Sequence, residues 1–589
     1  MQFTGARILI EALIEQGVDT VFGYPGGAVL FIYDELYNQR DRIRHILTSH
    51  EQHAAHAADG YARASGKTGV CIATSGPGAT NLVTGIAAAY MDSSPLVAIT
   101  GNVARGLLGR DSFQEVDIAG ITMPIVKHNW IVQDVSELAE IVREAFLVAA
   151  SGRPGPALID IPKDITAQMG EWTPLQHVHM ETVISQRARR LDERSRRKTF
   201  AESDIAEAAA LIRSAKRPLI YAGGGVIIAD AAEELKRFAE TLHAPVAVSL
   251  MGTGCFPREH ALCTGLIGMH GTVASNKAAQ TADLVIAVGS RFSDRVTSDT
   301  DTFATGANIL HFDIDPAEIN KNVPSMRWVI GNIKETLPRT LERLEKDGQL
   351  PENGWGNDIT AWKTHLPQTH QLERNQTHTL RPRFIIEETA KKLGSGAIAV
   401  TDVGQHQMWA AQFFPCNAPR KFITSGGLGA MGFGLGAAIG AAIGAAIVTQ
   451  TAEPGSPVVL FTGDGSFRMN CAEMATLAAY RIPLLIVIFN NRTLGMVRQW
   501  QRLFYEGRYS ETTLDRPPDF VKLADAYGIA AYRAENEAAF FDALEKAAAD
   551  IAATGGRAAL IEAIIDSDEK VLPMVPGGKP IHEQILHVI

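Results

Sequence analysis

Two short polar motifs, each placed directly after an apolar run, have the side chains needed to hold a divalent cation. Gly463-Asp464-Gly465-Ser466 follows the run that ends at Phe461, and Asn490-Asn491 follows the run that ends at Phe489. A carboxylate and an amide oxygen are hard ligands suited to Mg²⁺ or Ca²⁺. The glycines let backbone N–H groups approach phosphate oxygens, and a following helix would present its positive end to them. The two motifs therefore predict a site for a metal ion and a diphosphate group.

The order of the two motifs makes this prediction more specific. Either one alone reads equally well as an ordinary polar turn between a strand and a helix. Together they match the GDG…NN signature of proteins that bind thiamine diphosphate through Mg²⁺. This cofactor is an electron sink, so the signature predicts an enzyme that does carbanion chemistry on 2-keto acids.

A second candidate for chemistry is Glu51, in the stretch Ser49-His50-Glu51-Gln52-His53. Ser49 and Gln52 have the spacing of a capping box, so Glu51 could simply be a favourable acid in a first helical turn. A zinc site is disfavoured, because the histidines here do not have H-E-x-x-H spacing. The functional interpretation is a carboxyl group that hydrogen-bonds N1′ of the cofactor's aminopyrimidine. That contact favours the imino tautomer, whose nitrogen removes the thiazolium C2 proton.

The elements that must position these residues are short apolar strands alternating with helical patterns, which indicates parallel sheets covered on both faces. Predicted strands span residues 69–74, 96–100, 218–222, 284–288, 308–312, 397–401, 458–461 and 484–489. We expect an α/β fold with three doubly wound parallel-sheet domains. The motifs above follow the carboxyl ends of strands, where open parallel sheets bind ligands.

The expected domain limits are residues 1–170, 201–346 and 380–565, with a C-terminal tail at 566–589 near the active site. Residues 171–200 and 347–379 are expected to be linkers, because polar residues interrupt the α/β pattern there. The first linker carries a basic cluster between Arg187 and Lys198. Asp192 and Glu193 lie within this cluster and aromatic residues are missing from it, which favours a solvated linker over a nucleic-acid site.

Composition limits the class of protein. The 589 residues are 46% hydrophobic and 20% charged, the balance of a folded protein. A net charge of −10 gives no general attraction to nucleic acid or to an anionic membrane. The five cysteines are scattered and never in C-x-x-C spacing, which fits a reducing, cytoplasmic compartment. We also expect no signal or transit peptide, because a helical pattern starts at Ala6 without a basic or apolar leader.

The segment of residues 427–448 carries no charged side chain and is long enough to cross a bilayer as a helix. Gly436, Gly440 and Gly444 have the spacing that lets helices pack closely in membranes. However, the first half of the segment is rich in glycine, and its flanks lack aromatic or basic anchors. We interpret it as a buried glycine-rich turn that leads into a tightly packed core helix, and we predict no membrane span.

Longer motifs, spread over nearly the whole chain, resemble those of a known protein family. They are Gly23-Tyr24-Pro25-Gly26-Gly27, His50-Glu51-Gln52, Thr74-Ser75-Gly76-Pro77-Gly78-Ala79-Thr80-Asn81, Ser112-Phe113-Gln114-Glu115-Val116-Asp117, Gly152-Arg153-Pro154-Gly155-Pro156, Gly268-Met269-His270-Gly271, Asp402-Val403-Gly404-Gln405-His406-Gln407-Met408-Trp409, Thr424-Ser425-Gly426-Gly427-Leu428-Gly429, Gly495-Met496-Val497, Gln499-Trp500-Gln501 and Met574-Val575-Pro576. With them the chain resembles the catalytic large subunits of the acetohydroxyacid synthase (acetolactate synthase) family. Two departures are Gly436, where the family usually has proline, and Asn332, where aspartate is common.

The resemblance implies roles for residues at the thiamine diphosphate site. Asp464, Asn491 and the main-chain carbonyl of Thr493 would bind Mg²⁺. Glu51, Gln114 and Gly27 would be catalytic. The residues that would contact thiamine diphosphate are Gly26, Pro77, Asn81, Val403, Gly404, Gln405, His406, Gly429, Met431, Gly463, Gly465, Ser466 and Met496. Without the family, Met431 would read equally well as a core methionine.

The resemblance also implies a second cofactor, FAD, in a non-redox role in the middle domain. The first domain would bind the pyrimidine and the third the diphosphate and Mg²⁺. The residues matching the FAD-contacting stretches are Arg153, Gly223, Gly224, Gly225, Leu250, Met251, Met269, His270, Gly289, Arg291, Asp294, Arg295, Asp313 and Ile314. Local sequence alone does not require FAD, because Gly223-Gly224-Gly225 is not a G-x-G-x-x-G fingerprint.

The implied reaction is decarboxylation of pyruvate and transfer of the hydroxyethyl carbanion to pyruvate or 2-ketobutyrate. The products, 2-acetolactate and 2-aceto-2-hydroxybutyrate, would feed valine, leucine and isoleucine synthesis. The substrate contacts would be Phe113, Lys163, Arg295 and Trp500, although a tryptophan such as Trp500 is more often a packing residue. We expect a homodimer or homotetramer and a separate regulatory small subunit. The alternatives are a pyruvate oxidase, a glyoxylate carboligase, a 2-keto-acid decarboxylase or a silent paralogue that serves as a binding subunit.

Overall fold

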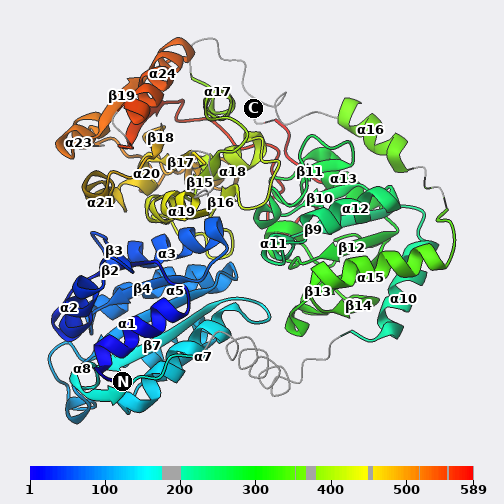
Figure 1. Cartoon of the computed structure of the whole chain (residues 1–589). Coiled ribbons are helices and arrows are strands. Elements are labelled where there is room, and N and C mark those ends of the chain that lie inside the picture. The colour runs from blue at the N-terminus through cyan, green and yellow to red at the C-terminus, as the bar shows by residue number, and fades with distance from the viewer. Residues whose placement is uncertain are drawn as a thin grey trace.

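The computed structural model describes residues 1–175, 200–351, 353, 355–365, 380–448, 456–516, 518–553 and 556–587. Within them lie three six-stranded sheets whose strand pairs are all parallel, each flanked by helices (Figure 1). The predicted fold class is confirmed. The predicted strands agree with the observed ones to within two residues at either end, because buried apolar runs mark them clearly.

The N-terminal sheet has the strand order β3-β2-β4-β5-β7-β6. Its strands are β2 (Thr20–Tyr24), β3 (Arg44–Leu47), β4 (Gly69–Ala73), β5 (Leu96–Asn102), β6 (His128–Ile131) and β7 (Pro156–Pro162). The helices are α1 (Gly5–Glu15), α2 (Leu30–Asn38), α3 (Glu51–Ser65), α4 (Pro77–Asn81), α5 (Val83–Met91), α6 (Ile118–Thr122), α7 (Leu138–Ala150) and α8 (Lys163–Ala167). A separate antiparallel pair joins β1 (Gln2–Thr4) to β8 (Met169–Glu171).

The central sheet has the order β11-β10-β9-β12-β13-β14. Its strands are β9 (Pro218–Ala222), β10 (Val246–Val248), β11 (Cys263–Leu266), β12 (Leu284–Val288), β13 (Asn308–Asp313) and β14 (Arg327–Ile330). The helices are α10 (Glu202–Ser214), α11 (Gly224–Ile228), α12 (Ala232–Leu242), α13 (Val273–Thr281), α14 (Asp294–Thr297), α15 (Ile333–Lys346) and α16 (Trp355–His365).

The C-terminal sheet has the order β16-β15-β17-β18-β20-β19. Its strands are β15 (Ile398–Thr401), β16 (Phe422–Ile423), β17 (Val458–Gly463), β18 (Leu485–Asn490), β19 (Ala530–Ala534) and β20 (Ala559–Ile564). The helices are α17 (Pro382–Leu393), α18 (Gln405–Phe413), α19 (Gly434–Val448), α20 (Asp464–Phe467), α21 (Met474–Tyr480), α22 (Gly495–Phe504), α23 (Phe520–Ala526) and α24 (Glu537–Ala553), with a 3₁₀ turn at Cys471–Glu473 before α21.

The second expected linker, residues 347–379, differs from the expectation in part, because it contains α16. Trp355 at the start of this helix is fully buried, and Ile359 is buried one turn later, in the core of the central domain. The two apolar residues lie on one face of a helix, a spacing that the surrounding polar residues obscured. Residues 366–379, and residues 176–199 of the first linker with its basic cluster, lie outside the described residues.

The uncharged segment forms a turn followed by α19, which lies against α3 of the N-terminal domain (Figure 1). Glycines permit this close packing: a Cβ on Gly440 would lie 1.8 Å from the carbonyl oxygen of Ala57, and one on Gly60 would lie 2.0 Å from that of Ala437. Among the described residues, no helix is long and apolar enough to span a membrane. The segment is therefore a core helix, as its sequence indicates.

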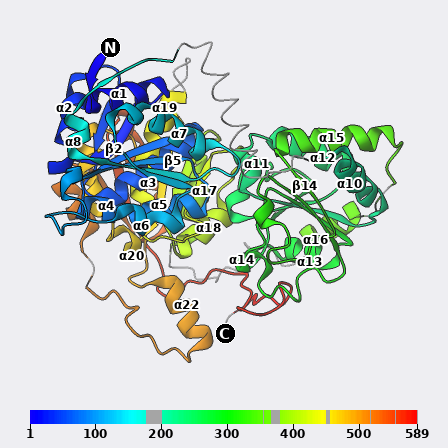
Figure 2. The ribbon, with the colours of Figure 1, turned by 90° about the horizontal axis from the view of Figure 1, so that it is seen from below.

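The C-terminal tail, described to residue 587, runs from the C-terminal domain to the central domain (Figure 2). The side-chain amide of Gln499 on α22 donates to the carbonyl of Val571 at 3.1 Å. Further along, the N–H of Val575 donates to the carbonyl of Met269 at 2.8 Å. Ile581 is buried in the core of the central domain. The tail thus ties two domains together beside the motifs singled out above.

Candidate active site

Asp464 and Asn491 are neighbours because the strands before them, β17 and β18, pair in parallel, with Gly463 opposite Phe489. Asp464 is 1% exposed, and within the described residues its Oδ2 has no hydrogen-bond partner. Burial raises the pKa of this carboxyl group to about 7. The N–H of Thr493 donates to Oδ1 of Asn491 at 3.1 Å, which folds the segment back beside Asp464.

These residues fit a Mg²⁺ ion. A buried carboxylate without a partner is costly, and a cation beside it would remove that cost. An aspartate oxygen, an amide oxygen and a main-chain carbonyl are the hard ligands that Mg²⁺ accepts. In the part of the chain that the structure describes, no group of three or more His, Cys, Asp or Glu is placed to bind a metal, which gives a zinc site no support here.

The residues predicted to hold the diphosphate lie at the ends of β15 and β17, which are also parallel neighbours. His406 on α18 is buried, and burial lowers the pKa of its ring to about 3, so the ring is neutral. Its Nε2 has no partner within the described residues. A Cβ on Gly404 or Gly463 would lie 2.7 or 2.9 Å from this ring, so a larger residue at either position would displace it.

The hydroxyl of Ser466 donates to the carbonyl of Val403 at 2.9 Å, which joins the two strand ends. Gly465 follows Asp464 at the start of α20, and a Cβ there would lie 2.7 Å from Cδ2 of Leu494. Both predicted diphosphate residues therefore belong to the same edge as Asp464. The absence of a side chain at Gly465 keeps the backbone of this turn close to the segment after β18.

The side-chain amide of Gln405 forms hydrogen bonds to protein groups through both its nitrogen and its oxygen. Its Nε2 donates to Oε1 of Gln499 at 3.0 Å and to the carbonyl of Glu569 at 2.7 Å. Its Oε1 accepts a hydrogen bond from Nδ2 of Asn491 at 3.1 Å. A contact from Gln405 to a diphosphate would therefore come from its main chain. Gln499 and the tail support Gln405 through these contacts, a role that the sequence motifs did not assign to them.

Glu51 lies at the corresponding edge of the N-terminal sheet, as the first residue of α3. It is 9% exposed, and Nδ2 of Asn81 donates to its Oε2 at 2.9 Å. The N-cap of α3 is His50, whose Nδ1 accepts the N–H of Gln52 at 3.1 Å. The capping-box interpretation, with Ser49 as the cap, is therefore wrong. Ser49 instead donates through its hydroxyl to the carbonyl of Ala472 at 2.9 Å, in the C-terminal domain.

The other predicted residues of the N-terminal domain gather round Glu51. Pro77 begins α4, which Asn81 ends, and a Cβ on Gly78 would lie 3.2 Å from Oε1 of Glu51. A Cβ on Gly26 would lie 2.5 Å from the side chain of Thr74, whereas one on Gly27 would meet open space. Gln114 has a φ of 62° and packs against Gly76.

Exposed apolar side chains flank this group. Phe113 is 89% exposed, Leu30 is 56% exposed, and Tyr24 and Phe31 are also exposed. Lys163 begins α8 at the end of β7, on the same sheet, and does not line the large cavity described next. An exposed cluster of this kind around a predicted catalytic group is typical of a surface that another chain covers.

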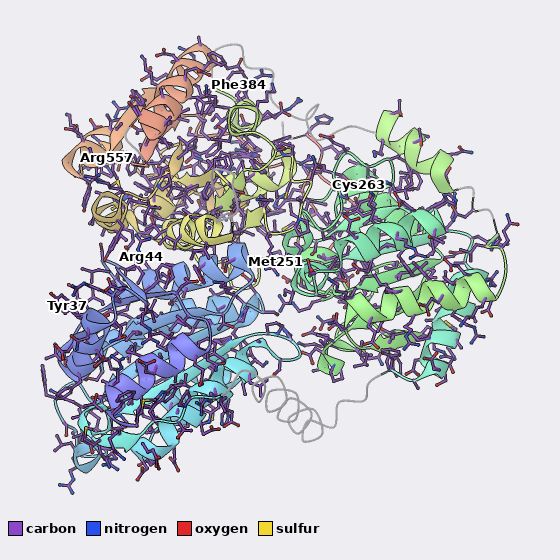
Figure 3. All side chains as sticks on the ribbon, viewed as in Figure 1. Tyr37, Arg44, Met251, Cys263, Phe384 and Arg557 are labelled. Carbon is purple, nitrogen blue, oxygen red and sulfur yellow. The ribbon has the colours of Figure 1, made fainter. Side chains whose placement is uncertain are left out.

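A cavity of about 980 Å³ lies where the three domains meet, beside Met251 (Figure 3). The predicted residues that line it are Arg153, Gly224, Gly225, Leu250, Met251, Met269, His270, Gly289, Arg291, Asp294, Arg295, Asp313, Ile314, Val403, Gly404, Gly429, Met431, Met496 and Trp500. Gly223 precedes this lining, and a Cβ there would lie 2.3 Å from the carbonyl oxygen of Gly289. The volume is at the upper end for ligand sites and suits a dinucleotide.

Two predicted substrate residues meet at this cavity. Trp500 on α22 and Arg295 on α14 both line it, and the ring of Trp500 also packs on Phe504 at 5.2 Å. Arg295 is exposed and pairs with Asp294 at 2.9 Å. The described lining does not include Glu51, Gly26, Gly27, Pro77, Asn81, Phe113, Gln114 or Lys163. One chain therefore presents two separate groups of predicted site residues.

Two further lining residues were not among the predicted site residues. Asn332 lines the cavity and caps α15, since its Oδ1 accepts the N–H of Lys334 at 3.0 Å. Asp92 lines it and accepts the N–H groups of Gly426 and Gly427 at 3.1 and 2.6 Å. A signal existed only for Asn332, which directly precedes a helix and has a good N-cap side chain. Asp92 is far from these glycines in sequence, so local pattern could not find it.

Comparison with known proteins gives matches along the chain. Three family models match: the thiamine pyrophosphate enzyme N-terminal TPP binding domain at residues 3–121, the central domain at 205–340 and the C-terminal TPP binding domain at 402–563. The acetolactate synthase large subunit of Corynebacterium glutamicum is 45% identical, over 98% of this chain and 89% of that protein. A probable acetolactate synthase large subunit of Methanocaldococcus jannaschii is 46% identical, over 98% and 94%. The acetolactate synthase large subunit of Parasynechococcus marenigrum is 46% identical, over 98% and 90%.

Proposed function

The chain belongs to the acetolactate synthase large-subunit family of thiamine pyrophosphate enzymes, and from this premise we propose its reaction and its site residues. The enzyme decarboxylates pyruvate and joins the remaining two-carbon unit to a second 2-keto acid. With pyruvate as the acceptor the product is 2-acetolactate, and with 2-ketobutyrate it is 2-aceto-2-hydroxybutyrate. These products lead to valine, leucine and isoleucine.

The observation that carries the proposal is the buried, unpartnered Oδ2 of Asp464 next to Asn491 and Thr493. We assign these three residues to Mg²⁺, with the carbonyl of Thr493 as the main-chain ligand. Glycines at positions 404, 463 and 465 add no side chain to an edge where a Cβ would meet His406 or Leu494, so a diphosphate would approach the backbone closely there. Neutral His406 offers a ring nitrogen to the same group without adding charge.

Thiamine diphosphate supplies the electron sink that makes loss of CO₂ from a 2-keto acid possible. The protein's task is to hold and activate it. With thiamine diphosphate bound, the carboxyl group of Glu51 would hydrogen-bond N1′ of the aminopyrimidine and hold a proton there, while Asn81 orients that carboxyl group. Met431 and Met496, which line the cavity, would supply apolar surface for the cofactor's rings, and Gly27 and Gln114 would contribute to the reaction centre.

The large cavity suits FAD, the second cofactor that we propose. Its lining combines glycines, which allow close approach, with Arg153 and Arg291, which can pair with phosphate oxygens. The same cavity is bordered by Met431, Met496 and Trp500, so FAD would lie beside the proposed acceptor pocket. We assign FAD a structural role, so replacing it with a flavin analogue of different reduction potential should leave the turnover of pyruvate unchanged.

We further propose that each active site combines two chains. Glu51, Gly27 and Gln114 do not line the cavity that Met431 and Gly404 border, among the described residues, so one chain keeps the two groups apart. On the same domain as Glu51, apolar side chains are exposed at Tyr24, Leu30, Phe31 and Phe113, and a protein surface that packs against them would bury them. A partner chain in a homodimer would supply that surface. A homotetramer, a regulatory small subunit and a cytoplasmic location stay predictions.

The experiment that tests the reaction is turnover of pyruvate with the purified protein while thiamine diphosphate, Mg²⁺ and FAD are omitted one at a time. We expect acetolactate as the product, and a loss of its formation when thiamine diphosphate or Mg²⁺ is left out. Acetaldehyde or acetate as the main product would instead indicate a decarboxylase or an oxidase of the same superfamily. No turnover of any 2-keto acid with all cofactors present would contradict the proposal.

A further inference from the structure

Glu473 is a buried carboxylate with no role in the proposed chemistry. It is 0% exposed and ends the 3₁₀ turn that leads from Asp464 to α21. A charge buried this deeply is tolerated only when several donors satisfy it. Its donors come from the N-terminal domain as well as from its own, so the residue connects the two domains.

The contacts of Glu473 converge on the segment that enters α3. Its Oε1 accepts the N–H of Ser49 at 2.9 Å and the N–H of His50 at 3.1 Å. Nδ1 of His53, on the first turn of α3, lies 3.0 Å from the same oxygen. The hydroxyl of Thr476 donates to Oε2 at 2.7 Å. A carboxylate at this place also stabilises the positive end of the helix.

Neighbouring residues of the same segment strengthen the connection. The hydroxyl of Tyr480 accepts the N–H of Leu47 at 2.8 Å, and the guanidinium of Arg44 lies 5.7 Å from the centre of the Tyr480 ring. Arg44 lies at the boundary between the N-terminal and C-terminal domains (Figure 3). The strand end and turn at residues 44–50 are therefore held by residues 472–480, immediately before Glu51.

We propose that Glu473 is a positioning residue that sets the start of α3 and thereby the carboxyl group of Glu51. This inference rests on the proposed role of Glu51. Asn81 holds the end of the Glu51 side chain, and Glu473 holds the backbone from which that side chain extends. A misplacement of a catalytic group by about 1 Å can lower the rate by about 10²-fold. The length of the Glu473 side chain, which sets the position of the backbone before Glu51, should therefore matter more than its charge.

Two variants separate the effect of the length of the Glu473 side chain from the effect of its charge. Glu473→Asp keeps the charge but withdraws the carboxylate by one methylene from the N–H groups of Ser49 and His50. Glu473→Gln keeps the length and the acceptor oxygen but removes the charge. The readout is the rate of deuterium exchange at the thiazolium C2 of bound thiamine diphosphate with Mg²⁺, since this step depends on Glu51 and requires no keto acid. The kcat and KM for pyruvate are measured alongside it.

We expect Glu473→Asp to slow C2 exchange and kcat by about 10²-fold while the KM for pyruvate stays near the wild-type value. Glu473→Gln should exchange at close to the wild-type rate. The control is Glu15→Ala, which removes a half-buried carboxylate that pairs with Arg143 at 2.6 Å and accepts the N–H of Leu175 at 2.7 Å. That control should lower thermal stability and leave C2 exchange unchanged.

Wild-type exchange in Glu473→Asp would overturn the inference. Should that variant fail to fold, Thr476→Val, which removes the donor to Oε2, takes its place; slowed exchange would support the inference and unchanged exchange would overturn it. Glu51→Gln in the same assay keeps the two proposals apart. If Glu51→Gln exchanges normally, the proposed role of Glu51 is wrong, whereas slow exchange there with normal exchange in Glu473→Asp removes only the role of Glu473.

Discussion

At the scale of single residues, Glu51 depends on contacts that its neighbours in sequence do not reveal. Asn81 orients the carboxyl group of Glu51. Gly78 lies close to the same group, since a Cβ built on Gly78 would be 3.2 Å from Oε1 of Glu51. His50, not Ser49, caps the helix that Glu51 begins. Asn81 and Gly78 contact the Glu51 side chain, and the His50 cap fixes the helix that carries it, so we expect conservative replacements of Glu51 to keep the fold and lose the chemistry.

Glu51→Gln should lower turnover of pyruvate by about 10²–10⁴-fold, the range for general acid–base groups, because an amide cannot share the N1′ proton in the same way. The hydrogen bond from Asn81 can still be made to the amide oxygen, so the unfolding midpoint should change little. Steady-state kinetics and thermal unfolding of the same preparation measure both quantities. Near-normal turnover would contradict the catalytic assignment.

Trp500 and Arg295 line the same cavity, which makes a pocket for the acceptor testable. An indole wall would favour the ethyl group of 2-ketobutyrate, and one methylene in an apolar pocket is worth about 1–3 kcal/mol, or roughly tenfold to a few hundredfold. Trp500→Leu should therefore collapse the preference for 2-ketobutyrate and leave acetolactate formation largely intact. Competition between the two keto acids gives the product ratio, and an unchanged ratio would return Trp500 to a packing role.

At the scale of elements, the contact between α3 and α19 packs the helix that Glu51 begins against the C-terminal domain. Gly60 and Gly440 let the two backbones touch, since a Cβ on either would overlap a carbonyl oxygen of the other helix. Such a close backbone contact fixes how the two helices lie relative to each other, because protein interiors are close-packed and have little space for a shift.

Gly440→Ala should lower stability although alanine is the better helix former by about 1 kcal/mol. The added Cβ would lie 1.8 Å from the carbonyl oxygen of Ala57, and overpacking of a core typically costs about 1–3 kcal/mol. Gly444→Ala on the same helix is the control, because its closest neighbour, the carbonyl oxygen of Tyr61, lies 3.0 Å away. Chemical unfolding should show a clear loss for the first variant and a smaller change for the second. Equal stabilities would mean that the helices can separate without cost.

At the scale of the whole molecule, the two groups of proposed site residues lie on different domains and do not share one cavity among the described residues. We propose that a second chain covers the exposed apolar side chains of the N-terminal domain and completes the site. A symmetric dimer would complete two sites at once, because the same two surfaces meet twice.

Mixing two inactive variants tests this arrangement directly. Glu51→Gln and Asp464→Asn damage opposite halves of the proposed site, so a mixed dimer would contain one intact site. After unfolding and refolding together in equal amounts, the mixture should regain roughly a quarter of wild-type activity, since half of the dimers are mixed and each has one working site. Either variant refolded alone is the control. Activity no higher than the controls, or a fully active species of monomer mass in light scattering, would contradict a shared site.

The sequence by itself determined the fold class, most strand positions and the strand ends at which the proposed metal ligands lie. Buried parallel strands are continuous apolar runs, and Asp464 and Asn491 directly follow two of them, so local pattern carried this information. It could not identify Asp92 or Glu473, or the contacts of Gln499, because all of these involve residues far away in the chain. It also obscured α16, whose apolar face lies among polar residues. Tertiary structure alone decided these features, because a hydrogen bond between distant segments leaves no periodic trace in either segment.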